Sequence, residues 1–300
     1  MGGIGFMGRM GDLGRTGILS LFLFYLFSIS LSSFASGPSS LASGPGEFGG
    51  NYWMEDSVVV IRKGVRAIPD YAFRDRKDIA EVRFEAPASL LSIGDYAFLG
   101  CENLRSISLP ASLASLGEGS FRECSSLEKI EVPSGIAKLP PYLFYWCEGL
   151  KKVSLPRRLK SIGRSCFGYC SSLEAVEIPS GVKNIGSNAF SCCISLREVA
   201  VPASVNELES YAFSDCRNLR KITFPANSSL LGELILSGCD RLEDIYEYSP
   251  TPPKFDCNSF LFEPDDEANY NRVILHVPSG RAAAYRKAPG WKLVHKIEDR

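Results

Sequence analysis

The stretch Ile93–Pro110, IGDYAFLGCENLRSISLP, contains the pattern that decides the fold. Its Phe, Cys, Leu, Ile and Pro positions recur every 23 residues along most of the chain. The recurring cysteines are Cys101, Cys124, Cys147, Cys170, Cys193, Cys216 and Cys239. Columns that stay in register over seven copies identify a tandem repeat.

The repeat unit predicts one short strand per coil. Ile107 and Leu109 alternate at period two, as in a β-strand, and Pro110 ends the strand because proline cannot donate to a sheet. A period of 20–29 residues with a leucine frame is typical of a leucine-rich repeat solenoid. We therefore expect short parallel strands joined by returns that are mostly irregular, turn-like or short helices. Ten strands are expected, beginning near residues 59, 82, 107, 130, 153, 176, 199, 222, 245 and 274.

The N-terminus has the features of a secretory signal peptide. Arg9 and Arg15 precede the apolar run Ile18–Leu31, and Ser33-Phe34-Ala35 offers small residues for cleavage. The run is short for a bilayer span, which needs about 20 apolar residues, although an uncleaved anchor remains the alternative. After cleavage we expect no membrane span.

The rest of the chain divides into three predicted parts. Residues 36–56 are rich in Gly, Ser and Pro and should form a flexible linker and lead-in. Residues 57–248 hold the clean repeats, and residues 249–300 hold an irregular repeat and a cap.

Composition excludes several classes of protein. Lysine and arginine total 33 against 34 aspartates and glutamates, a net charge of -1 that argues against a nucleic-acid partner. At 45% hydrophobic and 22% charged, the chain is not globally disordered. Only two histidines occur, and a catalytic thiol would need a paired base, so we expect neither an enzyme nor a metal or cofactor site.

The column cysteines have two interpretations. An exported protein can form disulfides. Adjacent coils, however, lie about 4.8 Å apart, whereas the Cβ atoms of a disulfide lie about 3.8 Å apart, which favours a ladder of buried thiols. Cys192 takes a variable position and is expected to be exposed, while Cys257 lies in the terminal insertion.

Two groups of residues in the middle of the repeats are candidates for binding a partner. An aromatic group should lie on the outside of adjacent coils, beside a weaker tyrosine column that includes Tyr142 and should pack at the coil edge. A group of basic residues lies in one coil that contains no acidic residue, and this group suits an anionic ligand such as a sulfated glycan. Ordinary surface variability and pairing with acids of neighbouring coils are the alternatives. The candidates are Tyr145, Trp146, Tyr169, Lys151, Lys152, Arg157, Arg158, Lys160 and Arg164.

The repeat unit Ile93–Pro110 resembles that of the BspA-like leucine-rich repeat family of bacterial surface and secreted proteins. Segments near the C-terminus, Ser249–Pro253, Val277–Gly280 and Gly290-Trp291, resemble the closing part of such proteins. The resemblance spans about residues 57 to 297, although this chain is shorter than larger family members. It implies surface-exposed binding or adhesion, with no shared catalytic residues.

These observations predict an exported, non-enzymatic binding or adhesion module. Its partners would be a protein or a glycan on host or neighbouring cells, and it would be secreted or held at the cell surface or envelope. The alternative is a structural spacer of the envelope or periplasm without a specific ligand.

Overall fold

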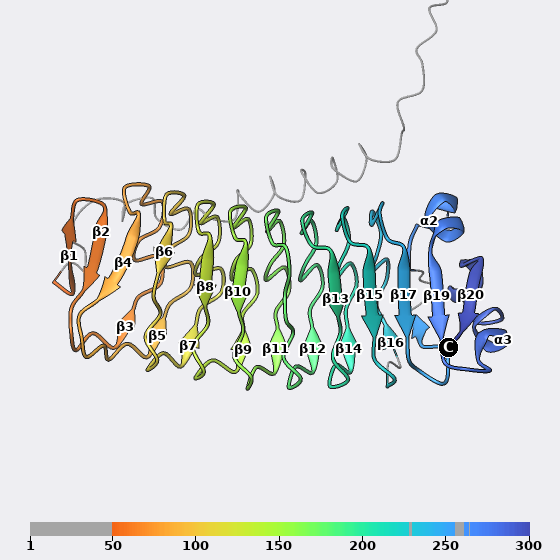
Figure 1. Cartoon of the computed structure of the whole chain (residues 1–300). Coiled ribbons are helices and arrows are strands. Elements are labelled where there is room, and N and C mark those ends of the chain that lie inside the picture. The colour runs from red at the N-terminus through yellow and green to blue at the C-terminus, as the bar shows by residue number, and fades with distance from the viewer. Residues whose placement is uncertain (1–49, 228–229, 256–260, 264) are drawn as a thin grey trace, which may run out of the picture. The chain divides into compact units, whose positions relative to one another are not determined.

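The computed structural model describes residues 50–227, 230–255, 261–263 and 265–300. The predicted signal segment, most of the predicted linker and Cys257 lie outside these residues. The described residues form one compact unit, a solenoid of stacked coils about 23 residues apart (Figure 1). The predicted leucine-rich repeat solenoid is confirmed.

The first row of strands, which we call the first ladder, contains the predicted strands. Several strands bury a central apolar residue and point its neighbours outward, as β10 does with Val153 between Lys152 and Ser154. The strands stack in parallel through nearly all the coils. They are β2 (Val58–Ile61), β4 (Glu81–Phe84), β6 (Ser106–Ile107), β8 (Lys129–Glu131), β10 (Lys152–Ser154), β13 (Glu198–Ala200), β15 (Lys221–Phe224), β17 (Asp244–Glu247) and β19 (Ile274–Val277).

The strand expected near residue 176 is absent, which corrects the count of ten. Residues 173–179 have no strand pairing, although Val176 still packs against the core. No side-chain contact described in the structure accounts for this interruption.

A second ladder of two-residue strands occupies the return half of each coil, where irregular or helical structure was expected. A buried Ile or Leu ends each strand except the last, which ends at the partly buried Phe255. The strands are β3 (Ala67–Ile68), β5 (Ser92–Ile93), β7 (Ser115–Leu116), β9 (Lys138–Leu139), β11 (Ser161–Ile162), β12 (Asn184–Ile185), β14 (Glu207–Leu208), β16 (Leu230–Leu231) and β18 (Lys254–Phe255).

Both ladders are interrupted at the same boundary, between β6 and β8 and between β7 and β9. In the coils that continue the second ladder, the residue after the strand donates to the preceding coil, as Gly163 N does to Leu139 O at 2.9 Å. At this boundary the residue is Pro140, which has no N–H. The bond that would reach Leu116 is therefore missing.

A third ladder of backbone bonds lies in the turns and crosses this boundary. Phe121 N donates to Leu143 O at 3.1 Å, and Glu123 N donates to Tyr145 O at 2.8 Å. The turns hold residues two before and two after each core phenylalanine at positive φ, such as Tyr142 at 56° and Trp146 at 61°. Non-glycine residues rarely adopt this conformation, and the inter-coil bonds hold them in it.

Columns of identical side chains fill the core. Six stacked pairs join the seven phenylalanines from Phe73 to Phe213, with ring centroids 5.1 to 5.8 Å apart. Each column cysteine is buried and donates its S–H to the carbonyl oxygen of the phenylalanine in the preceding coil. All nine described cysteines are free, so the thiol ladder is confirmed.

Additional elements close both ends of the stack. Strand β1 (Tyr52–Glu55) pairs antiparallel with β2, and the Tyr52 ring packs edge-on against Phe73 at 4.9 Å. At the other end β20 (Lys296–Asp299) pairs with β19. Two short helices and a 3-10 turn cover this end: α2 (Glu267–Arg272), α3 (Ala282–Tyr285) and η1 (Trp291–Leu293).

Hydrogen bonds attach the C-terminal cap to the insertion that precedes it. The Tyr285 hydroxyl donates to Ser249 O at 2.9 Å, and the Trp291 indole donates to Pro253 O at 2.8 Å. Both rings are fully buried. Within the described residues, no helix is long and apolar enough to cross a membrane.

Candidate partner-binding surface

The structure brings the three predicted aromatic residues into one cluster and adds Tyr142. The Tyr145 ring is the hub, because its centroid lies 5.5 Å from each of Tyr142, Trp146 and Tyr169. Trp146 and Tyr169 meet edge to face at 5.4 Å. Aromatic pairs prefer such edge-to-face arrangements. We call these four residues the aromatic cluster.

Backbone geometry sets the positions of Trp146 and Tyr169. Both lie two residues after a core phenylalanine and have a φ of 61°. Trp146 N donates to Gly168 O at 2.9 Å, and Tyr169 N donates to Ser191 O at 2.8 Å. Neighbouring rungs of the third ladder therefore hold the two rings side by side.

All four members of the aromatic cluster are half-buried rather than standing freely on the outside. The Tyr145 ring lies over Gly168, where an added Cβ would approach it to 3.0 Å. Burial raises the pKa of the Tyr145 hydroxyl to about 12 and that of Tyr169 further. The Tyr145 and Tyr169 hydroxyls therefore stay protonated at physiological pH.

Two arginines stack on the aromatic cluster. The Arg122 guanidinium lies 5.2 Å from the Tyr145 centroid and pairs with Glu123 at 2.9 Å. Arg164, one of the predicted basic residues, lies 5.0 Å from the Tyr142 centroid and is exposed. Cation–π contacts of this kind orient the guanidinium over the ring.

Cys192 corrects the expectation of an exposed thiol. It is half-buried and follows Trp146 and Tyr169 along the same row of turns. Burial raises the pKa of its thiol, and the nearby Asp215 carboxylate raises it further. A thiol with a raised pKa is a poor nucleophile.

The six predicted basic residues are all exposed but lie on different sides of their coil. Lys151 and Lys152 lie at the first ladder. Lys151 pairs with Glu128 at 3.6 Å, whereas Lys152 is in register with Lys129 rather than with a carboxylate. No carboxylate therefore faces Lys152 in register on β8, because the like charge of Lys129 occupies that place.

Arg157, Arg158 and Lys160 lie at the turn between the two ladders. The turn is closed by the bond from Leu159 N to Pro156 O at 3.0 Å. Lys160 then enters the second ladder, where its N–H donates to Ala137 O at 2.8 Å. These three cations are therefore separated from Lys151 and Lys152 by the length of strand β10.

A polar cluster on the first ladder was missed by the sequence reasoning. His276 stacks on Tyr246 with centroids 4.4 Å apart, and its Nε2 lies 2.7 Å from Asp244 Oδ1. Arg300 lies 4.3 Å from the Tyr246 centroid. The sequence did offer a signal for this cluster. Tyr246 and His276 each lie next to a buried residue of a strand, and side chains alternate along a strand, so both rings should point outward. The cluster joins β17 to β19 near the cap.

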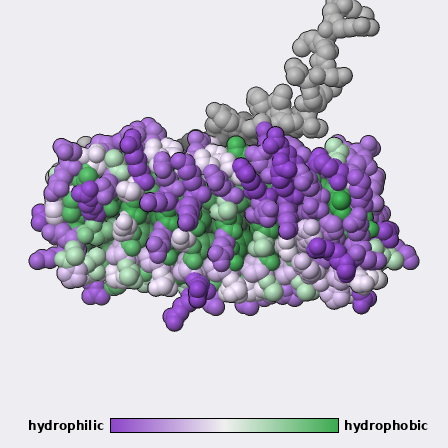
Figure 2. Space-filling view, in the orientation of Figure 1, coloured by the Kyte–Doolittle hydropathy of each residue, from purple (hydrophilic) through white to green (hydrophobic). Residues whose placement is uncertain are grey.

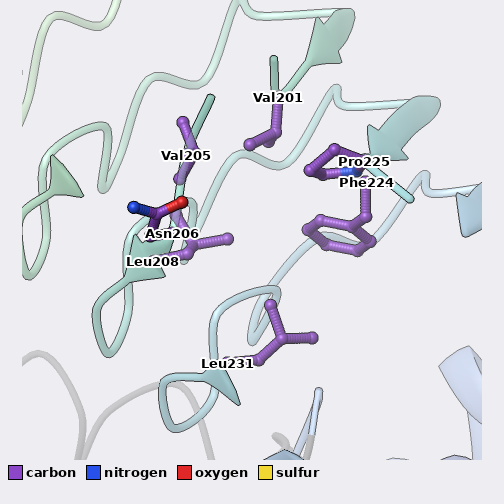
Figure 3. A pocket seen from close by; sticks show the side chains of 7 residues that line it. All are labelled: Val201, Val205, Asn206, Leu208, Phe224, Pro225 and Leu231. Carbon is purple, nitrogen blue, oxygen red and sulfur yellow. The ribbon is translucent and has the colours of Figure 1, made fainter. Parts of the chain in front are cut away.

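The depression in Figure 3 lies between the two ladders and is apolar. It has room for about one water molecule, whereas small-molecule sites usually enclose about 300–1,000 Å³. Its lining residues are Val201, Val205, Asn206, Leu208, Phe224, Pro225 and Leu231. This depression is too small to hold a substrate or an organic cofactor.

Figure 2 shows a band of hydrophobic side chains running lengthwise along the solenoid between hydrophilic borders. Across the described ranges, no group of three His, Cys, Asp or Glu residues is placed to hold a metal ion. The aromatic cluster and the exposed cations are the candidate surface features for engaging a partner.

Comparison with known proteins finds one matching family model, the BspA type leucine-rich repeat region, in six copies. The matches span residues 55–145 and 137–260. A search of the curated proteins finds no match.

Several solved structures are similar to this chain. A leucine-rich repeat protein of T. pallidum is 29% identical with a TM-score of 0.50, and the match covers 64% of this chain and 86% of that one. A leucine-rich repeat protein from Bacteroides ovatus is 19% identical with a TM-score of 0.48, covering 82% and 86%. The pneumococcal vaccine antigen PcpA is 19% identical with a TM-score of 0.37, covering 81% and 79%.

Proposed function

Because the chain belongs to the BspA-type leucine-rich repeat family, we propose that it is an exported, non-enzymatic module that binds a protein or glycan at the bacterial cell surface. Proteins with these repeats are bacterial surface-type proteins. Solenoids also present extended surfaces to partners. The signal-like N-terminal sequence supports export.

The observation that carries this proposal is the aromatic cluster with its two stacked arginines. Tyr, Trp and Arg are the residues most enriched at the energetic centres of protein interfaces. Here Tyr145 and Trp146 come from one coil and Arg164 from the next, and all three are partly or fully accessible. Because neighbouring rungs hold the rings, binding would cost little side-chain ordering.

The spacer alternative also has a structural observation behind it. Three backbone ladders and a stacked phenylalanine column make a regular rod that would separate two points without any ligand. A spacer needs no particular residue on its surface. Substitution of the aromatic cluster should therefore be neutral for a spacer and harmful for a binding module.

A binding screen separates these two functions. The residue 50–300 chain would be applied at micromolar concentration to arrays of host matrix proteins and glycans. We expect at least one partner whose binding is lost in the variant Trp146→Ala, Tyr169→Ala. Tyr248→Ala is the matched control, because Tyr248 is 48% exposed and lies outside the aromatic cluster.

The variant must keep the parent's melting temperature, so that a loss of binding is not due to unfolding. Absence of any partner above background favours the spacer. A partner that binds the variant and the parent equally would show that the binding surface lies outside the aromatic cluster.

A further inference from the structure

Five exposed cations from three consecutive coils gather at one corner of the solenoid. Three of them, Arg157, Arg158 and Lys160, belong to one coil, and Lys138 and Lys183 come from the coils on either side. Within the described residues none of the five forms an ion pair. We call these five residues the basic corner.

Backbone pairing places the three lysines on neighbouring rungs. Lys183 N donates to Lys160 O at 2.7 Å, so these two residues occupy equivalent positions in adjacent coils. Lys138 is in register with Ser161, the residue next to Lys160. Parallel strands lie about 4.8 Å apart, so the three rungs extend over about 10 Å along the solenoid.

Short side chains on both sides leave the two arginines uncovered. The equivalent turn of the preceding coil contains Ser134 and Gly135, and that of the next coil contains Ser180 and Gly181. The Lys160 ammonium reaches across to the next coil, where a Cβ on Gly181 would lie 3.5 Å from it. The cations therefore form a continuous strip over neighbouring coils.

Acidic groups limit the strip on its C-terminal side. On the next rung of the second ladder Glu207 pairs in register with Asn184, whose side chain donates to it. Glu207 is exposed. A ligand that follows the basic corner would therefore meet negative charge beyond Lys183.

We infer that the basic corner binds a sulfated polysaccharide. An extended chain with several anionic groups can contact rungs along the strip, and each arginine can hold a sulfate through two parallel N–H bonds. Single-stranded nucleic acid is a poorer fit, because its binding sites offer aromatic rings to the bases and the basic corner has none. This inference rests on the proposed export and surface binding.

Heparin is the probe. Binding of the residue 50–300 chain would be measured by calorimetry at increasing salt, with hyaluronan, poly-glutamate and single-stranded DNA as comparison ligands. We expect heparin to bind most tightly and to weaken as salt rises, because exposed charges are screened beyond about 8 Å at physiological ionic strength.

The test variant is Arg157→Gln, Arg158→Gln, Lys160→Gln. It should bind heparin about tenfold more weakly, since each exposed charge contact contributes a fraction of a kcal/mol. The control, Lys287→Gln, Lys292→Gln, Lys296→Gln, removes the same charge from exposed cap positions and should retain binding. Both variants should keep the parent's melting temperature.

Three results would overturn the inference. They are absence of heparin binding at low salt, equal losses in the two triple variants, and binding of poly-glutamate or DNA as tight as that of heparin. The proposed function would survive each of them if the array screen finds a partner that depends on Trp146 and Tyr169. Conversely, heparin binding through the basic corner would stand even if that array partner were independent of the aromatic cluster.

Discussion

The Cys147 thiol donates a hydrogen bond to the carbonyl oxygen of Phe121 in the preceding coil, at a distance of 3.1 Å. This contact recurs at every column cysteine and explains why the repeat retains a thiol there. A small, weakly polar side chain fills the core slot and also satisfies a buried carbonyl oxygen.

The column cysteines should be reduced in the native protein. We expect intact mass spectrometry after denaturing alkylation to show at least seven modified thiols. Under native conditions alkylation should be slow, because burial raises the pKa of these thiols, to about 12 for Cys101. Detection of three or more disulfides among the seven would contradict this prediction.

The phenylalanine column should dominate the stability of the solenoid. Phe144 is fully buried between Phe121 and Phe167, so Phe144→Ala should lower the free energy of unfolding by about 3–5 kcal/mol. Ser154→Ala on the exposed side of β10 should change it by less than about 0.5 kcal/mol. Denaturant melts measure both, and equal losses would mean that the inward and outward assignments are wrong.

Gly163 should not tolerate a side chain. A Cβ there would lie 2.6 Å from the carbonyl carbon of Pro140 and 2.8 Å from Leu139 O, and these backbone atoms cannot move aside as a side chain can. Gly163→Ala should therefore cost about 1–3 kcal/mol, as overpacked positions do. Gly50→Ala is the control, because nothing lies within 4 Å of its Cβ position. If thermal melts gave both variants the same melting temperature, the close approach of the coils at Gly163 would be contradicted.

Stability should fall as pH rises because of Glu247. This carboxyl is buried at the cap, one oxygen has no described partner, and burial raises its pKa to about 8. The unfolded chain releases this proton near pH 4.5, so between about pH 4.5 and 8 the folded state holds more protons and loses stability with rising pH. The total loss from this group is on the order of a few kcal/mol.

Glu247→Gln keeps the shape of the side chain and removes its titration. The variant should show a flatter dependence of unfolding free energy on pH between 5 and 9, and should exceed the parent in stability at the alkaline end. Urea melts at several pH values check this. An unchanged pH profile would show that Glu247 does not titrate in this range.

The 23-residue columns predicted the first ladder, apart from the strand expected near residue 176, and the buried face of each coil. Ile107 and Phe144 belong to columns that recur because their side chains must be buried away from water, and such recurrence is visible in the sequence. The second ladder was not predicted, because a strand as short as Ser161–Ile162 offers no alternation to detect. The third ladder depends on positive φ at residues such as Tyr142, where a glycine would have been the usual signal.

The candidate surfaces were partly predictable. The 23-residue spacing of Trp146 and Tyr169 correctly placed them on adjacent coils. Charges were harder, because the basic residues of a single coil point in different directions. Two members of the basic corner, Lys160 and Lys183, share a column, because Lys183 lies one period after Lys160 in the sequence. Grouping cations by column as well as by coil would have linked these two lysines.

We expect this rod to be mechanically weakest at the boundary before Pro140. A repeat array behaves as a series of interfaces between neighbours, and under tension the interface with the fewest bonds yields first. At the seam before Pro140 the first two ladders are both interrupted, and the Phe121–Phe144 centroid separation of 5.8 Å is the widest in the column. A pulling force along the solenoid should therefore part the coils there, leaving blocks of intact repeats on either side.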